Sequence, residues 1–244
     1  MTTPPDSTSS SSTSRKPKKP AADAPKRVPP PSVGGFRYRI DREHPIGGEM
    51  SDVLRGLISR VQLPWLLDHY ARTPVLAVFA LLNGLLSIGI MSALALITHS
   101  PFVFPSLGPT AFLFFYTPNA PSASPRNTII GHAIGVVAGY FSLLVTGLTH
   151  AGPALSVGVS WPRVLAAALS LGLTAGLMVL LKSPHPPAGA TTLIISLGLL
   201  TGPLQLLILM VAVVLLTVQA FAINRLAGIP YPLWSPRASS DSDS

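Results

Sequence analysis

Two Pro- and Gly-rich stretches carry the residues best suited to binding chemistry. The first is Ser106-Leu-Gly-Pro-Thr110, and the second is His185-Pro-Pro-Ala-Gly-Ala-Thr-Thr192. Proline has no N–H and cannot lie inside a helix, whereas the residues after it can begin one. We therefore predict that each stretch opens a half-helix. The free N–H groups and the positive dipole end at such an N-terminus attract anions.

The predicted substrate-binding residues lie at or near these two breaks. They are Gly108, Thr110, Arg126, His132, His185, Gly189, Thr191 and Thr192. Hydroxyl groups add donors to those of the backbone. Two such N-termini facing each other around a cavity near the middle of a membrane would seat a small anion among donors.

Each of four polar residues near the breaks has two possible roles. Arg126 is a cap or interface anchor, or a pathway residue that recruits anions. Asn127 is read as a helix N-cap ahead of ligand contact. His132 faces a water path, or is neutral and hydrogen-bonds another helix. His185 gates or carries a proton, with an ordinary pKa of about 6.5, or it braces the turn.

The absence of two residue types from the membrane domain excludes several kinds of chemistry. No Asp or Glu occurs between Tyr70 and Ser240, and the chain has no Cys. Thiolate chemistry, disulfides and carboxylate acid–base pairs are therefore excluded from this stretch. His99, His132, His150 and His185 include no pair at i, i+4 spacing, so we expect no metal and no cofactor. We also expect that the chain is not an enzyme.

The elements that must position these residues are membrane helices. The mean hydropathy is +0.50 and only 11% of residues are charged. Four apolar runs reach the 20 or so residues that cross a bilayer: Val75–Ile97, Thr128–Thr149, Trp161–Leu181 and Pro203–Ile223. Two shorter half-helices, Gly108–Tyr116 and Ala188–Leu199, lie between them.

The predicted fold is thus all-α, a polytopic membrane helix bundle of two long-short-long repeats. Interrupted segments in matching places of two halves indicate a transport site at the repeat interface. Repeats of Gly every four residues, at Gly131, Gly135 and Gly139 and again at Gly172 and Gly176, predict close helix packing.

Charge predicts the topology. Twelve of the 17 Lys and Arg residues precede the first span, which places both termini in the cytoplasm. If each short segment completes a crossing, Arg126 and Lys182 lie inside and Arg163, beside Trp161, anchors the outer end. If the short segments only dip in and return, Arg126 and Lys182 lie outside. We expect a plasma membrane location, with an organellar membrane as the alternative.

Composition divides the chain into four parts. Residues 1–48 form a basic tail, too poor in apolar residues to fold and so predicted to be disordered. Residues 49–72 are an amphipathic interfacial helix and linker, with an apolar stripe from Met50 to Val61 and Trp65 at headgroup depth. Residues 73–226 are the transmembrane domain, and residues 227–244 are the C-terminal tail.

The stretch around His185, Pro186 and Pro187, from Lys182 to Thr192, resembles the signature of the HPP family of integral membrane proteins. The stretch Ser106–Ala111, Pro125-Arg-Asn127 and Gly131-His132 are similar to that family's pattern as well. The resemblance runs from about Arg72 to Trp234. It implies a multi-helix membrane domain and, since some photosynthetic members act in nitrite uptake, a nitrite transporter.

Two functions follow as hypotheses. The first is a membrane transporter or channel for a small inorganic anion such as nitrite. The second is a non-transporting scaffold or sensor that works through its basic N-terminal tail. The expected partners are the anion and the lipid bilayer, with no nucleic acid, and a homo-oligomer is allowed. A scaffold has no reason to keep two broken helices, whereas a permeation site requires them.

Overall fold

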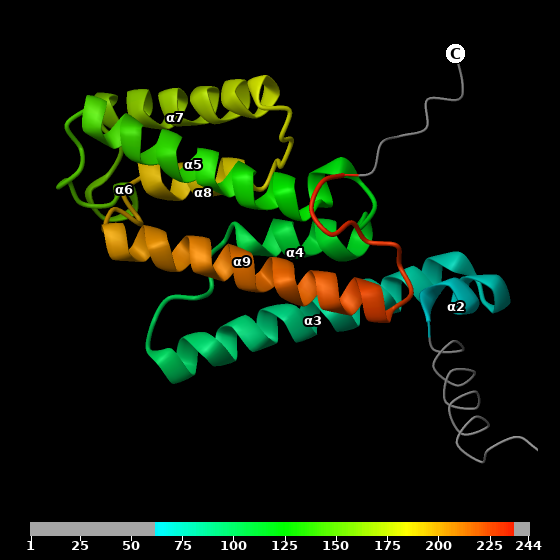
Figure 1. The fold of residues 1–244 in the computed structure, drawn as a ribbon. Helices are drawn as coiled ribbons and strands as arrows, with labels where there is room; N and C mark the ends of the chain where they lie inside the picture. Colours follow the sequence, from blue (N-terminus) through cyan, green and yellow to red (C-terminus); the bar gives the residue numbers. More distant parts are fainter. Residues whose placement is uncertain (1–61, 237–244) are drawn as a thin grey trace, which may run out of the picture. The chain divides into compact units, whose positions relative to one another are not determined.

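The computed structural model describes residues 62–236, and within that range the regular elements are helices (Figure 1). In chain order they are α2 (Leu63–His69), α3 (Arg72–Thr98), α4 (Leu107–Tyr116), η1 (Pro121–Ala123), α5 (Pro125–Val145), α6 (Ala154–Val157), α7 (Trp161–Leu180), α8 (Ala188–Ser196) and α9 (Pro203–Leu226). The predicted tail and most of the amphipathic helix, residues 1–61, lie outside the described residues.

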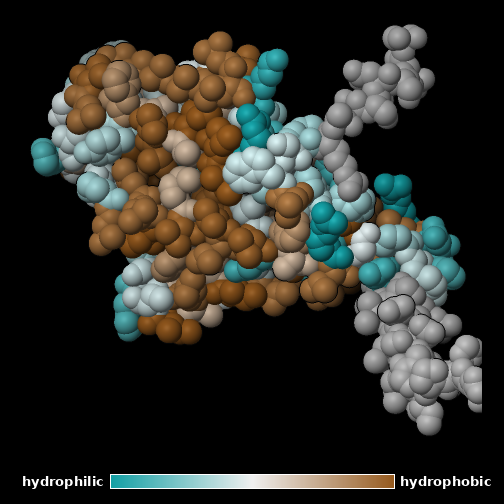
Figure 2. Space-filling model, in the orientation of Figure 1, coloured by the Kyte–Doolittle hydropathy of each residue, from teal (hydrophilic) through white to brown (hydrophobic). Residues whose placement is uncertain are grey.

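Four of the helices, α3, α5, α7 and α9, are long and apolar enough to cross a membrane. They match the four predicted spans to within about four residues at each end. Hydrophobic residues cover most of the visible surface along these helices, and hydrophilic residues gather towards the two ends (Figure 2). The chain is therefore a multi-pass membrane protein, and the all-helical prediction of long-short-long repeats is confirmed.

The start of α5 differs from the prediction. The helix begins at Pro125, and its N-cap is Ser124, whose hydroxyl accepts from the Asn127 N–H. The prediction that Asn127 caps this helix is therefore wrong. The reason is that proline suits the first turn of a helix, where its missing N–H costs nothing, so the helix starts three residues earlier.

The half-helix α8 begins beside the middle of α7. A Cβ on Gly189 would lie 3.4 Å from the Leu171 side chain, and the Thr192 hydroxyl donates to the Ser170 carbonyl at 3.4 Å. The other end of α8 lies at the start of α7, since Arg163 donates to the Ser196 carbonyl. The segment Lys182–Pro187 and α8 together therefore run the full length of α7.

The half-helix α4 repeats this arrangement against α3. Gly108 lines a cavity with Gly84 and Ile88 in the middle of α3, and the rings of Phe115 and Phe79 are 6.3 Å apart. α4 thus starts at the middle of α3 and runs back towards the beginning of that helix (Figure 1).

The two halves run in opposite directions. α3 starts at the end of the bundle where α9 finishes, with the Leu63 N–H bonded to the Ala227 carbonyl. α7 starts at the opposite end. Arg126 contacts the Lys182 carbonyl, so both residues share the end that holds the start of α3. Of the two predicted topologies, the structure has the one in which each short segment completes a crossing.

A row of glycines on α5 brings α8 into close contact. A Cβ would lie 2.8 Å from the Ala188 carbonyl oxygen if placed on Gly135, and 2.9 Å from the Ile195 side chain if placed on Gly139. Close packing at this row is confirmed. Gly172 and Gly176 of α7 have no atoms within 4 Å of such a Cβ, so the same prediction is wrong for them within this chain.

Candidate functional site

Four fully buried polar side chains meet where the two half-helices begin: Thr110 of α4, His132 of α5, His185 of the segment before α8, and Thr191 of α8. His132 joins the two half-helices, because its Nε2 lies 3.0 Å from the Thr110 hydroxyl and its Nδ1 lies 2.7 Å from the Thr191 hydroxyl. The His185 Nε2 lies 3.2 Å from the His132 Nε2 and 3.3 Å from the Thr110 hydroxyl. We call this group the histidine–threonine cluster.

Close approach of the Pro-rich segment to α5 is what positions His185. A Cβ on Gly131 would lie only 2.6 Å from the His185 Cβ, so glycine is needed directly before His132. The two imidazole rings then stand 4.8 Å apart at 58°. Adjacent residues of α5 therefore serve one site, the first by its lack of a side chain and the second by its ring.

Hydrogen bonds outside the cluster fix the orientation of His185. Its Nδ1 donates to the Ser122 carbonyl at 2.7 Å, with the Thr128 hydroxyl 3.4 Å away. Because a carbonyl can only accept, Nδ1 carries a hydrogen. Ser122 is held in turn by η1, whose last residue, Ala123, accepts a hydrogen bond from the Tyr231 hydroxyl. The sequence reasoning gave no role at the site to Ser122, Thr128 or Tyr231.

The backbone at the start of α8 differs from the expected anion cradle. Its first three N–H groups, from Ala188 to Ala190, donate to the carbonyls of His185, Pro186 and Pro187 at 2.9–3.0 Å. They are not free, as the prediction required. Proline cannot donate, yet its carbonyl accepts well, so the Pro-rich segment closes its own helix start. Side chains are the donors that remain at this half-helix.

The structure brings four of the eight predicted binding residues together and leaves the other four apart. Gly108 lines an apolar cavity of about 220 Å³ on the α3 side of α4. Gly189 and Thr192 face α7, next to Leu171 and Ser170. Arg126 donates to the carbonyls of Leu181 and Lys182, the two residues directly after α7. The geometry thus agrees with the capping reading of Arg126.

Arg163 has a different place from the one predicted. It is 2% exposed and donates to the Ser196 carbonyl at 3.0 Å and the Gly152 carbonyl at 2.8 Å. Its neighbour Trp161 is 84% exposed. Arg163 is therefore a buried cap on the last turn of α8 and does not anchor at the interface. The Arg163 guanidinium can be buried here without a carboxylate because the carbonyls at a helix C-terminus carry partial negative charge.

A cavity of about 350 Å³ leads towards the cluster between the last turns of α7 and the Pro-rich segment. It is lined by Lys182 and His185 together with apolar side chains of α7. Lys182 is exposed, so a cation stands at its mouth. Thr110, His132 and Thr191 line neither this cavity nor the one beside Gly108. The side chains of the cluster lie within hydrogen-bond distance of one another at the place where a cavity was predicted.

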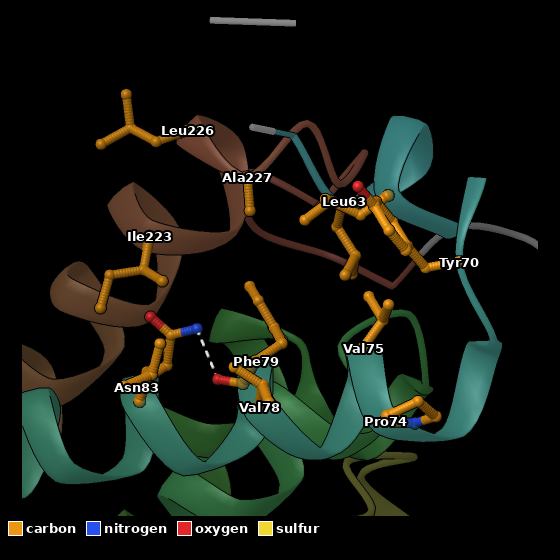
Figure 3. A pocket seen from close by; sticks show the side chains of 12 residues that line it. Leu63, Tyr70, Pro74, Val75, Val78, Phe79, Asn83, Ile223, Leu226 and Ala227 are labelled. Carbon is orange, nitrogen blue, oxygen red and sulfur yellow. Dashed lines mark hydrogen bonds between the residues drawn. The ribbon is translucent and has the colours of Figure 1, made fainter. Parts of the chain in front are cut away.

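The largest of these cavities, about 670 Å³, lies elsewhere, between α2, α3 and the end of α9 (Figure 3). Its lining is almost wholly apolar. The Asn83 side-chain amide in its wall donates to the Phe79 carbonyl at 2.7 Å. This cavity offers an anion few polar partners, so the cluster is the better candidate site.

Within residues 62–236, no group of three or more His, Cys, Asp or Glu side chains is placed to hold a metal. The pair of imidazoles in the cluster is bonded to hydroxyls and a carbonyl. These partners are suited to proton exchange and to donation towards an anion.

Comparison with known proteins agrees with this architecture. The family model described as "HPP, transmembrane region" matches residues 70–232. Two transmembrane proteins of Dictyostelium discoideum are 36% and 34% identical to the chain, each over 93 residues. These alignments cover 38% of this chain and 29% and 27% of those two proteins. No solved structure matches the chain.

Proposed function

Because the chain belongs to the HPP transmembrane family, we propose that it moves a small inorganic anion across the membrane, as a transporter or a channel, with nitrite as the candidate substrate. The observation that carries this proposal is the histidine–threonine cluster at the point where two half-helices begin. Discontinuous helices that meet at mid-depth are typical of transport sites.

The electrostatics of the span favour an anion. No carboxylate lies between Tyr70 and Ser240 to repel one. The cluster supplies hydroxyl and imidazole N–H donors from three helices and from the segment before α8, all without exposure to solvent. An anion that leaves water needs such donors to replace its hydration. Lys182, at the mouth of the cavity beside His185, would attract it to the pathway.

The four side chains touch one another, so the described conformation is closed at the cluster. Passage of an anion requires that they part. The half-helices are the elements suited to this movement, because each is linked to the long helix before it by a non-helical segment, residues 99–106 or 182–187.

A scaffold or sensor that works through the basic tail is the rival function. An acid-free membrane domain fits a scaffold too, but a scaffold has no reason to keep two broken helices, and the cluster that both half-helices share counts against it. An enzyme is less favoured still, because the cluster pairs no nucleophile with a carboxylate or thiol. We place the protein in the plasma membrane with both termini cytoplasmic, and keep an organellar membrane as the alternative. A homo-oligomer is compatible with this function.

Flux measurements on purified full-length protein in liposomes test the proposal. Nitrite, nitrate, formate and chloride would be compared with protein-free vesicles. Thr191→Val should lower flux of the preferred anion about 10-fold or more, because a hydrogen bond to a charged group is worth roughly 1.5–3 kcal/mol. Thr217→Val is the matched control, since this buried hydroxyl bonds only its own helix, at the Val213 carbonyl. Wild-type flux no higher than that of empty vesicles for every anion would refute transport.

A further inference from the structure

The proton positions in the cluster can be assigned from its geometry. The His185 Nδ1 carries a hydrogen, because it donates to the Ser122 carbonyl. In the neutral ring, the His185 Nε2 therefore holds a lone pair. That lone pair faces the His132 Nε2 at 3.2 Å and the Thr110 hydroxyl oxygen at 3.3 Å.

The Thr110 hydroxyl donates to the Ser106 carbonyl at 2.9 Å, so its oxygen accepts within the cluster. The His132 Nε2 must then carry a hydrogen, since otherwise lone pairs would face each other on all sides. In the neutral ring of His132, Nδ1 is an acceptor. The Thr191 hydroxyl, 2.7 Å away, therefore donates to His132 when both imidazoles are neutral.

The cluster has room for one additional proton. Two N–H groups cannot point at each other across the 3.2 Å between the two Nε2 atoms. One hydrogen only can therefore lie between them. A second hydrogen must go to the His132 Nδ1. That N–H then donates to the Thr191 oxygen. The Thr191 hydroxyl keeps its hydrogen but no longer donates it to His132.

Protonation thereby creates an anion donor. In the neutral cluster the Thr191 hydrogen is held by His132, and in the protonated cluster it can turn to another acceptor. No acidic group is present to balance the added charge, because Tyr70–Ser240 contains no carboxylate.

The other charged and titratable groups of the packed elements are occupied elsewhere. Arg126 caps α7, and Arg163 caps the far end of α8. Lys182 stands at the cavity mouth, and Arg225 lies over the Phe221 ring. The tyrosines Tyr116, Tyr140 and Tyr231 make no hydrogen bond to either imidazole.

We propose that the His132–His185 pair binds one proton together with one anion, and that the protein is an electroneutral 1:1 proton–anion symporter. The inference rests on the proposed transport function and adds its driving force and stoichiometry. Anion binding and protonation are coupled reciprocally, so the anion raises the affinity for the proton as much as the proton raises that for the anion.

Full-length protein in liposomes tests the coupling with nitrite as probe. A proton gradient directed inward should drive nitrite accumulation of about tenfold per pH unit, the ratio expected for one proton per anion. A membrane potential set by potassium and valinomycin should leave accumulation unchanged. Protein-free vesicles correct for diffusion of nitrous acid.

The outcomes separate the two proposals. Nitrite flux that follows the membrane potential and ignores the proton gradient would overturn symport and leave transport standing. Absence of protein-dependent nitrite flux would overturn both.

A binding measurement on detergent-purified protein is independent of flux. Nitrite added in weakly buffered solution at neutral pH should be accompanied by uptake of one proton per chain. His185→Gln should abolish this uptake, whereas His150→Gln, at an exposed histidine, should keep it. Nitrite binding without proton uptake in the wild type would contradict the inference even if the His185 variant fails to fold.

Discussion

At the scale of single residues, Thr191 differs from three of the other buried threonines. Thr110, Thr174 and Thr217 donate to the carbonyl four residues earlier in their own helices. For Thr191 that carbonyl belongs to Pro187, which already accepts from the Ala190 N–H. The Thr191 hydroxyl is thus available for His132, because the Pro-rich segment uses its own carbonyls.

Gly131 offers a test of how finely the cluster is positioned. Gly131→Ala would place a Cβ 2.6 Å from the His185 Cβ, which forces the Pro-rich segment away from α5. We expect a loss of roughly 1–3 kcal/mol of stability, as for other overpacked sites, and a sharp fall in anion flux. The thermal unfolding midpoint in detergent and liposome flux measure the two effects.

Gly172→Ala is the control, since open space surrounds that position and alanine favours helix by about 1 kcal/mol over glycine. It should leave flux unchanged and stability equal or higher. Equal behaviour of the two variants would show that close approach at Gly131 does not matter.

Tyr231 supports the cluster from outside. Tyr231→Phe would leave the buried Ala123 carbonyl without its donor, at a cost of about 1–3 kcal/mol. Tyr70→Phe, at a 61% exposed ring, should cost much less. The thermal unfolding midpoint in detergent, measured for both variants, compares these two costs. Equal midpoints for both variants would show that the buried hydroxyl adds nothing.

The same tyrosine gives a pH dependence of stability. Burial raises the pKa of Tyr231 above its ordinary value, so the folded state holds its proton more tightly than the unfolded state. This contribution to stability is complete below pH about 10, the ordinary tyrosine pKa, and is lost as the pH rises above it. The loss should be absent from Tyr231→Phe, and unfolding midpoints measured between neutral and alkaline pH check this.

At the scale of elements, each half-helix ends against a polar side chain of a long helix. Arg163 of α7 holds the end of α8 through the Ser196 carbonyl, and the Asn224 side chain of α9 donates to the Phe114 carbonyl near the end of α4 at 3.1 Å. A short helix whose last carbonyls lie within a membrane protein needs such donors, because water cannot reach them. When the cluster opens, the ends of α4 and α8 farthest from it therefore stay bonded to α9 and α7.

Arg163→Met tests this tether. The change removes hydrogen bonds to the buried Ser196 carbonyl and the partly buried Gly152 carbonyl, so we expect a destabilisation of roughly 2–6 kcal/mol, at about 1–3 kcal/mol for each carbonyl left without a donor. Arg225→Met, at an exposed arginine, serves as the matched control. Unfolding midpoints in detergent compare them. A loss no greater than that of the control would show that α8 does not depend on its cap.

At the scale of the whole molecule, the two halves are inverted, and each half-helix together with the non-helical segment before it runs the length of a long helix. Asn119, between α4 and α5, then lies at the same end as the start of α3, and Ser156 lies at the opposite end. Both are exposed. This geometry and the distribution of Lys and Arg together predict sidedness.

Single cysteines in this Cys-free chain test the topology in intact cells. An impermeant thiol reagent should label Ser156→Cys and spare Asn119→Cys, with detergent-permeabilised cells as the control for reactivity. If the reagent labels Asn119→Cys from outside and spares Ser156→Cys, the proposed orientation is wrong.

The sequence by itself determined the spans, the two breaks and the acid-free membrane domain. These follow from local hydrophobicity and from proline, whose missing N–H acts wherever the residue stands. The sequence also determined that His132 and His185 are the histidines near the breaks. It did not determine their partners.

The tertiary structure alone decided that His132 bridges Thr110 and Thr191, residues separated by 81 positions, and that Gly108, Gly189 and Thr192 face elsewhere. It also decided that Arg163 is a buried cap and that the first N–H groups of α8 are already paired. The physical reason is that the face a side chain takes depends on how helices distant in sequence pack, and here the glycines of α5 set that packing.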